Sequence, residues 1–211
     1  MTQAPVQRVV LWGLLVATLI AIAVTALLAP DWSRPNPGAP PPDLGASPDF
    51  SLTNRDGSTV TKADLLGSVW VADFIFTRCG LSCPRMTEIM NRLEAALPND
   101  IEIYRVSFSV DPSYDTPAVL QAYAESWNIR DPRWLFLTGG RDEIHTTVVE
   151  GFKLALDFEP PPEISTPDEP ILHSSRFVLV DAAGAIRGYY NVVEGGELQR
   201  LLSDLRSLTQ S

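Results

Sequence analysis

The chain has 211 residues, 16 of them basic and 26 acidic, and its formal net charge is −10. Charges of both signs are spread along the sequence without a basic patch, which excludes a nucleic-acid-binding surface. Two cysteines cannot by themselves hold a structural tetrahedral zinc or an iron–sulfur cluster, because those sites need four ligands.

An uncharged run rich in Leu, Val, Ala and Ile occupies residues 9–29. At helical rise this run spans roughly 30 Å, the thickness of the hydrocarbon core of a bilayer. It exceeds the apolar region of a secretory signal, roughly 7 to 15 residues, although residues 24–26 form a passable cleavage site. We therefore expect an uncleaved transmembrane anchor, with a cleaved signal as the alternative. Arg8 before the run and Asp31 after it predict a short cytoplasmic N-terminus (residues 1–8) and a soluble part on the extracytoplasmic, periplasmic side.

Residues 30–48 contain seven prolines, a composition that favours an extended polyproline conformation over helix or strand. We interpret this segment as a semi-rigid linker; a proline-rich ligand for a partner domain is the alternative. The remaining residues, 49–211, have the size of one domain.

Within this domain, strands and helices alternate before the chain ends in a hairpin and a helix. We expect a hairpin over 50–53 and 58–61, a helical turn over 62–66, strands over 69–76, 101–110 and 134–137, helices over 86–97, 116–127, 141–150 and 196–208, and a hairpin over 177–181 and 185–190. The proline-rich residues 158–170 predict an exposed loop. This order predicts an α/β fold, in which helices cover both faces of a mixed sheet.

Cys79 and Cys83 lie between the expected strand at 69–76 and the expected helix at 86–97. A helix N-terminus favours the thiolate, which is both the nucleophile and the metal ligand of cysteine chemistry. The spacing brings both sulfurs to one side of a helical turn, where they can form a disulfide or offer two soft ligands. A purely structural disulfide is a third possibility, although closing so small a loop gains little.

The chain also has two histidines, and Cu(I) would need only one of them beside two thiolates. His173 stands just before the apolar run at 177–181, where a ligand could be held rigidly. His145 lies in a charged stretch with helical character, which is more typical of a solvated side chain.

Three segments resemble the motifs of the Sco/SenC family of copper-binding, thioredoxin-like proteins: residues 76–84 (FTRCGLSCP), 109–117 (SVDPSYDTP) and 172–175 (LHSS). The resemblance runs from about Asp49 to the C-terminus. It implies a thioredoxin-like fold and implies that Cys79, Cys83 and His173 are copper ligands, for Cu(I) with Cu(II) left open. It also implies delivery of copper to cytochrome c oxidase, and the partner would be the copper-bearing subunit of that oxidase or another copper chaperone. Because the sequence offers no obvious interface, we expect the soluble domain to be a monomer.

Two positions depart from the family pattern: many relatives carry an acidic residue in place of Ser82 and an Asp in place of Leu172. Neither position is a ligand in the family, so the departures concern the tuning of the thiols and of His173. Asp111 and Asp115 follow an expected strand. They predict an acidic rim that steers a basic partner or, for Asp115, a helix cap.

The alternative function is a thiol–disulfide oxidoreductase, in which the Cys79/Cys83 pair reduces cysteines of the oxidase subunit or senses redox state. His173 discriminates between the two functions, because thiol exchange alone does not require it.

Overall fold

The computed structural model describes residues 11–19, 25, 40–97, 101–161, 163, 166, 170–193 and 195–209. Its two compact units are residues 1–39 and 40–211. In the first unit, residues 11–19 are helical, and six large apolar side chains of this helix are 50–67% exposed. No helix within the described part of the chain is both long and apolar enough to cross a bilayer. Much of the predicted anchor, residues 9, 10, 20–24 and 26–29, lies outside the described residues, so the anchor stays a prediction.

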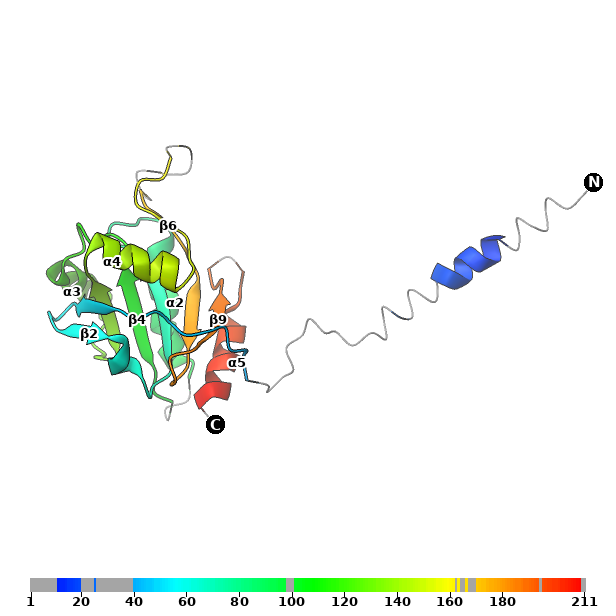
Figure 1. Cartoon of the computed structure of the whole chain (residues 1–211), viewed down its shortest axis with the longest axis horizontal. Coiled ribbons are helices and arrows are strands. Elements are labelled where there is room, and N and C mark those ends of the chain that lie inside the picture. The colour runs from blue at the N-terminus through cyan, green and yellow to red at the C-terminus, as the bar shows by residue number, and fades with distance from the viewer. Residues whose placement is uncertain are drawn as a thin grey trace, which may run out of the picture. The chain divides into compact units, whose positions relative to one another are not determined.

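The second unit is built on a seven-stranded mixed sheet in the order β2-β1-β5-β4-β3-β8-β9 (Figure 1). The three central strands β3, β4 and β5 are parallel, and the pairs on either side of them are antiparallel. The strands of the sheet are β1 (Ser51–Asn54), β2 (Thr59–Thr61), β3 (Trp70–Ile75), β4 (Tyr104–Ser109), β5 (Trp134–Thr138), β8 (Phe177–Val180) and β9 (Ile186–Tyr190).

Helices cover both faces of this sheet, as the alternating sequence predicts. They are the 3-10 turn η1 (Lys62–Leu65), α2 (Ser82–Ala95), α3 (Pro117–Ser126), α4 (Arg141–His145) with the π-helical turn η2 (Thr146–Gly151), and α5 (Leu198–Thr209). In Figure 1, α4 crosses in front of the sheet. On that face, Phe152, which follows η2, packs edge-on against Phe74 and Phe108. On the other face, Tyr123 of α3 packs against Phe136.

The sheet edge at β9 is covered by residues that the sequence analysis assigned to the linker. Leu44 donates its N–H to the carbonyl of Ile186, and the N–H of Ile186 donates to the carbonyl of Gly45, both at 2.8 Å. Ala46 forms a bridge with Ala185. Residues 40–48 are therefore attached to the domain, and the part of the predicted linker at 30–39 lies outside the described residues.

A second, two-stranded ladder lies apart from the main sheet and was not predicted from the sequence. In it, β6 (Leu156–Asp157) pairs antiparallel with β7 (Leu172–His173), so that Leu156 faces His173. Strands of two residues carry no alternation pattern, which is why the sequence predicted only the loop between them, at 158–170, and not the strands themselves.

Candidate metal centre

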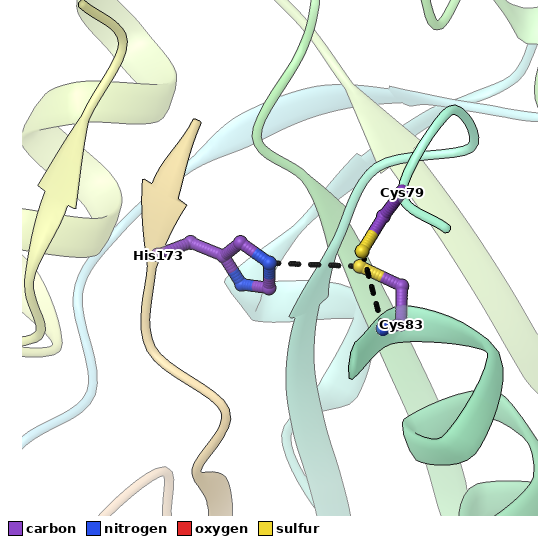
Figure 2. A group of neighbouring side chains, drawn as sticks. All are labelled: Cys79, Cys83 and His173. Atoms are coloured by element: carbon purple, nitrogen blue, oxygen red, sulfur yellow. Dashed lines mark hydrogen bonds between the residues drawn. The ribbon is translucent and has the colours of Figure 1, made fainter. Parts of the chain in front are cut away.

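Cys79, Cys83 and His173 come together at one end of the sheet, although His173 is 90 residues from Cys83 in the sequence. Their ligand atoms all lie within 4.8 Å of one another, and Cys83 Sγ is 3.5 Å from His173 Nε2. Figure 2 shows the histidine ring pointing at the two sulfurs. Among the residues that the structure describes, no other group of three or more His, Cys, Asp or Glu side chains is arranged to hold a metal ion.

The cysteines are positioned by the connection from β3 to α2. The Cys79 N–H donates to the carbonyl of Phe76 at 3.2 Å, which closes the turn at the end of the strand. Helix α2 begins at Ser82, four residues earlier than predicted, so Cys83 lies in its first turn. The Cys83 N–H then points at Cys79 Sγ, 3.4 Å away. An N–H at a helix start is a donor without a partner inside the helix, and here it stabilises the sulfur as a thiolate.

His173 reaches the centre from β7, with its backbone paired to β6. Its Nδ1 lies 3.2 Å from the carbonyl oxygen of Ser174, which can only accept, so the proton is assigned to Nδ1. Nε2 is then left with a free lone pair directed at the cysteines. The ring also packs edge-on against buried Phe76, with centroids 5.4 Å apart. Orientation by a partner on the other ring nitrogen is typical of metal-binding histidines.

The two thiols differ in their proton affinity. The hydrogen bond from the Cys83 side chain lowers the pKa of Cys79 to about 3, and backbone N–H groups act in the same direction. Burial raises the pKa of Cys83 well above its usual range, and the neighbouring Cys79 thiol adds to this shift. At neutral pH the pair therefore holds one thiolate, at Cys79, and one proton, at Cys83.

This asymmetry predicts selective alkylation. In the reduced, metal-free protein at pH 6, iodoacetamide should modify Cys79, which is 6% exposed, and leave fully buried Cys83 untouched. The rate should be nearly constant from pH 5 to pH 8, because Cys79 is a thiolate throughout that range. Peptide mass spectrometry over a time course measures both.

Cys83→Ala is the matched variant for this experiment. Loss of the hydrogen bond should raise the pKa of Cys79 toward its usual range, so that alkylation at pH 6 slows by at least about tenfold and recovers with rising pH. Equal reactivity of both cysteines in the wild-type chain would contradict the assignment.

Asp111 and Asp115 do not form the exposed acidic rim that the sequence suggested. Both are buried. Asp115 accepts hydrogen bonds from the Thr77 N–H at 3.1 Å, from the Thr77 hydroxyl, and from the Ser109 hydroxyl at 2.7 Å. It does not cap α3 either, since Thr116 accepts from the N–H of Val119.

Asp111 is bound to Arg78, whose Nε donates to it at 2.9 Å, and the guanidinium lies over the ring of Tyr114. The two carboxylates thus fix Thr77 and Arg78, the residues immediately before Cys79. Sequence reasoning identified both aspartates as candidates but not this positioning role.

Asp73 is a residue near the centre that sequence reasoning missed. It occupies the middle of β3 and is fully buried, and neither carboxylate oxygen has a hydrogen-bond partner among the described residues. Burial raises the pKa of Asp73 to about 7, against the opposing influence of neighbouring Ser107 and His173. A charged residue in an otherwise apolar strand was the signal that could have drawn attention to it.

The remaining sequence candidates lie at or outside the edge of the centre. The Ser82 hydroxyl is 3.6 Å from Cys79 Sγ, so a neutral hydroxyl lies beside this sulfur. Leu172 is 39% exposed beside His173. His145 lies at the end of α4, near Phe158, and does not belong to the ligand group.

Comparisons with known proteins agree with this geometry. The SCO1/SenC family model matches residues 40–210. The SCO1 protein homolog of Bacillus subtilis (strain 168) is 37% identical over 160 residues, which are 75% of this chain and 80% of that protein.

Two solved structures extend the similarity to the fold. BsSco, described as a member of the Sco family of cytochrome c oxidase assembly proteins with a disulfide switch, is 31% identical with a TM-score of 0.67, over 81% of this chain and 98% of that one. ScoI of Bradyrhizobium japonicum with copper bound is 26% identical with a TM-score of 0.62, over 77% and 99% of the two chains. The fold is thus the predicted thioredoxin-like α/β fold, and the chain belongs to the SCO1/SenC family.

Proposed function

We propose that the chain is a copper chaperone, in which Cys79, Cys83 and His173 bind one copper ion for delivery to a respiratory oxidase. The observation that carries the proposal is the convergence of these three ligand atoms within 4.8 Å of one another. Two sulfurs and one imidazole nitrogen suit a soft ion that accepts three ligands, which is the chemistry of Cu(I). A structural zinc site would need a fourth ligand.

The comparisons support both the cargo and its destination. A relative with this fold has been solved with copper bound, and another is described as a cytochrome c oxidase assembly protein. A cargo ion must also be able to leave. The site suits exchange because it lies at the end of the sheet, with His173 only partly buried. The copper-bearing subunit of the oxidase, or a second copper chaperone, is the proposed partner.

Titration of the reduced full chain with Cu(I), in nonionic detergent and against a competing chelator, tests the proposal. We expect one tight equivalent, which the Cys79→Ser/Cys83→Ser double variant should lose. His173→Ala should weaken binding by about 100-fold, because a direct ligand contributes at least as much as the outer-shell partners of a metal site.

His145→Ala is the matched control for this titration, since it removes the other histidine without touching the ligand group. It should bind Cu(I) as tightly as the unmodified chain. Weak binding that is indifferent to His173 would overturn the chaperone proposal.

A second candidate function, thiol–disulfide oxidoreduction, is favoured by the difference in pKa between the two thiols. A thiolate at Cys79 beside a protonated, buried Cys83 is the arrangement in which one sulfur attacks and the other resolves. A Cys79–Cys83 disulfide that forms and is reduced readily in a thiol buffer, in a chain that binds copper weakly, would support this function instead.

We also propose that residues 9–29 anchor the chain in a membrane, with residues 1–8 in the cytoplasm and the domain on the periplasmic side. The proposal rests on the uncharged apolar sequence and on the exposed apolar side chains of the helix at 11–19, which need an apolar environment.

A further inference from the structure

The charged residues next to the metal ligands in the sequence have the opposite sign to the net charge of the chain. Each ligand has an arginine within three positions, namely Arg78, Arg85 and Arg176, and no acidic residue lies within that distance of any ligand. The chain nevertheless carries a net charge of −10. The arginines are therefore a local feature of the metal-binding edge.

Two of these three guanidinium groups are free to meet a partner. Arg78 is bound to Asp111. Arg85, in the first turn of α2, and Arg176, just before β8, are both exposed. Neither side chain makes a hydrogen bond or ion pair with a residue that the structure describes; the only hydrogen bond of Arg176 comes from its backbone N–H.

The topology places these two arginines at the same end of the sheet, the end at which the parallel strands β3, β4 and β5 finish. Strand β8 runs antiparallel to β3, so β8 begins near the end of β3. The cysteine turn (residues 76–81) and α2 follow that end of β3. Arg85, in α2, and Arg176, just before β8, therefore lie at the end of the sheet that holds the metal ligands.

Two apolar side chains next to the ligands in the sequence are also exposed. Leu81, between the two cysteines, is 57% exposed, and Leu172, next to His173, is 39% exposed. Exposed apolar side chains together with arginine are typical of protein interfaces.

Among the residues that the structure describes, the acids on the segments around the ligands largely take part in contacts within the chain. Asp111 and Asp115 are buried in the contacts described above, and Glu159 pairs with Arg141 at 3.0 Å. Asp157, opposite Leu172 in the β6–β7 ladder, is exposed, and its carboxylate accepts the N–H of Glu159.

We propose that Leu81, Leu172, Arg85 and Arg176 form a docking surface for an acidic protein domain that carries its own soft copper ligands. The inference rests on the proposed copper delivery and names the chemistry of the acceptor. A protein of net charge −10 repels an acidic partner from most of its surface, so two free arginines at one edge would orient that partner with its ligands toward the ion. The sequence analysis expected an acidic rim and a basic partner, whereas the two exposed arginines favour an acidic partner.

Transfer at this surface is a ligand exchange without a change in oxidation state. The Cu(I) bonds to Cys79, Cys83 and His173 break as two bonds to the thiolates of the acceptor form. Of the two protons that the acceptor thiols release, one is taken up by the thiolate of Cys83 and the other passes to solvent, while Cys79 stays a thiolate. No electron moves.

Two synthetic acceptor peptides test the proposal. Both contain Cys-x-x-x-Cys; one is flanked by four glutamates and the other by four lysines. The full chain, loaded with Cu(I) in nonionic detergent, is mixed with each peptide, and the transfer rate is measured. At ionic strength near 10 mM, Arg85→Glu/Arg176→Glu should slow transfer to the glutamate peptide by about tenfold and accelerate transfer to the lysine peptide. Comparing variant with wild type on the same peptide cancels the intrinsic reactivity of that peptide.

Salt and a distant arginine provide the controls. In about 1 M salt, where the Debye length is about 3 Å, the effects should disappear. Arg130 is also exposed, but it precedes β5 and thus lies at the opposite edge of the sheet, so Arg130→Glu should change either rate by less than about twofold.

The outcomes separate the two proposals. Copper occupancy of the starting protein is measured first, and a chain that holds no copper would overturn the proposed function. The docking surface alone would be overturned if a copper-loaded chain showed equal changes in transfer rate for Arg130→Glu and for Arg85→Glu/Arg176→Glu. It would also be overturned if neither variant changed the rate.

Discussion

Replacing Asp73 by asparagine should remove up to about 4 kcal/mol from the loss of stability that the wild-type domain undergoes between pH 4 and pH 7. In the unfolded chain this carboxyl ionises near its ordinary pKa of 3.8, whereas burial in β3 raises the folded-state pKa to about 7. The folded protein therefore binds more protons than the unfolded one within this window. Its stability is fully present below about pH 4, falls as the pH rises, and levels off above about pH 7.

Urea unfolding of the reduced, metal-free chain at several pH values measures this effect as a difference between wild type and variant. Burial raises the pKa of Asp115 in the same direction, so some decline should remain in the variant. Asp142→Asn, at an exposed position in the first turn of α4, is the matched control and should leave the wild-type slope in place. Parallel curves for wild type and Asp73→Asn would show that folding does not raise the pKa of this carboxyl.

Asp115→Ala is expected to destabilise the domain by about 3 kcal/mol and to weaken Cu(I) binding by about tenfold. The substitution removes the acceptor for the Thr77 N–H and for the hydroxyls of Thr77 and Ser109. Buried donors without partners are costly, and the turn that carries Cys79 would lose its tie to β4. Chemical unfolding and the chelator competition measure the two effects.

A double-mutant cycle with Ser109→Ala separates the local hydrogen bond from general disruption. Ser109→Ala alone removes one donor and should destabilise the domain by about 1 kcal/mol, but should be nearly neutral in the Asp115→Ala background. Full additivity of the two losses would contradict the network.

The sequence predicted the strand and helix order because most elements carry their own local signals. The Thr116-Pro117 start of α3 and the two hairpins have such signals, and all three are confirmed. The helix expected from Met86 begins four residues earlier, at Ser82, and Pro84 occupies its third position. The helix expected at 141–150 is divided into α4 and a π-helical turn, a change in hydrogen-bonding register that no composition signal marks.

The candidate ligands were predicted from motifs, and the structure brings all three together. What the sequence could not give is the environment around them. The sequence alone does not tell whether Asp111 and Asp115 face solvent or bind other residues. Their burial depends on hydrogen bonds to Thr77 and Arg78, which are more than 30 residues away in the sequence. The proton affinity of Asp73 likewise depends on what covers β3, and no local pattern records that.

The support of His173 has a consequence for how an ion would leave. β7 holds two residues, and its pairing partner β6 is equally short and stands outside the seven-stranded sheet. So small a ladder is marginal on its own and can open locally while the sheet stays intact. The cysteines, in contrast, are held by β3 and α2. We therefore expect fluctuations to detach the histidine first, leaving a two-coordinate ion bound by sulfur that an incoming thiolate can approach from the vacated side.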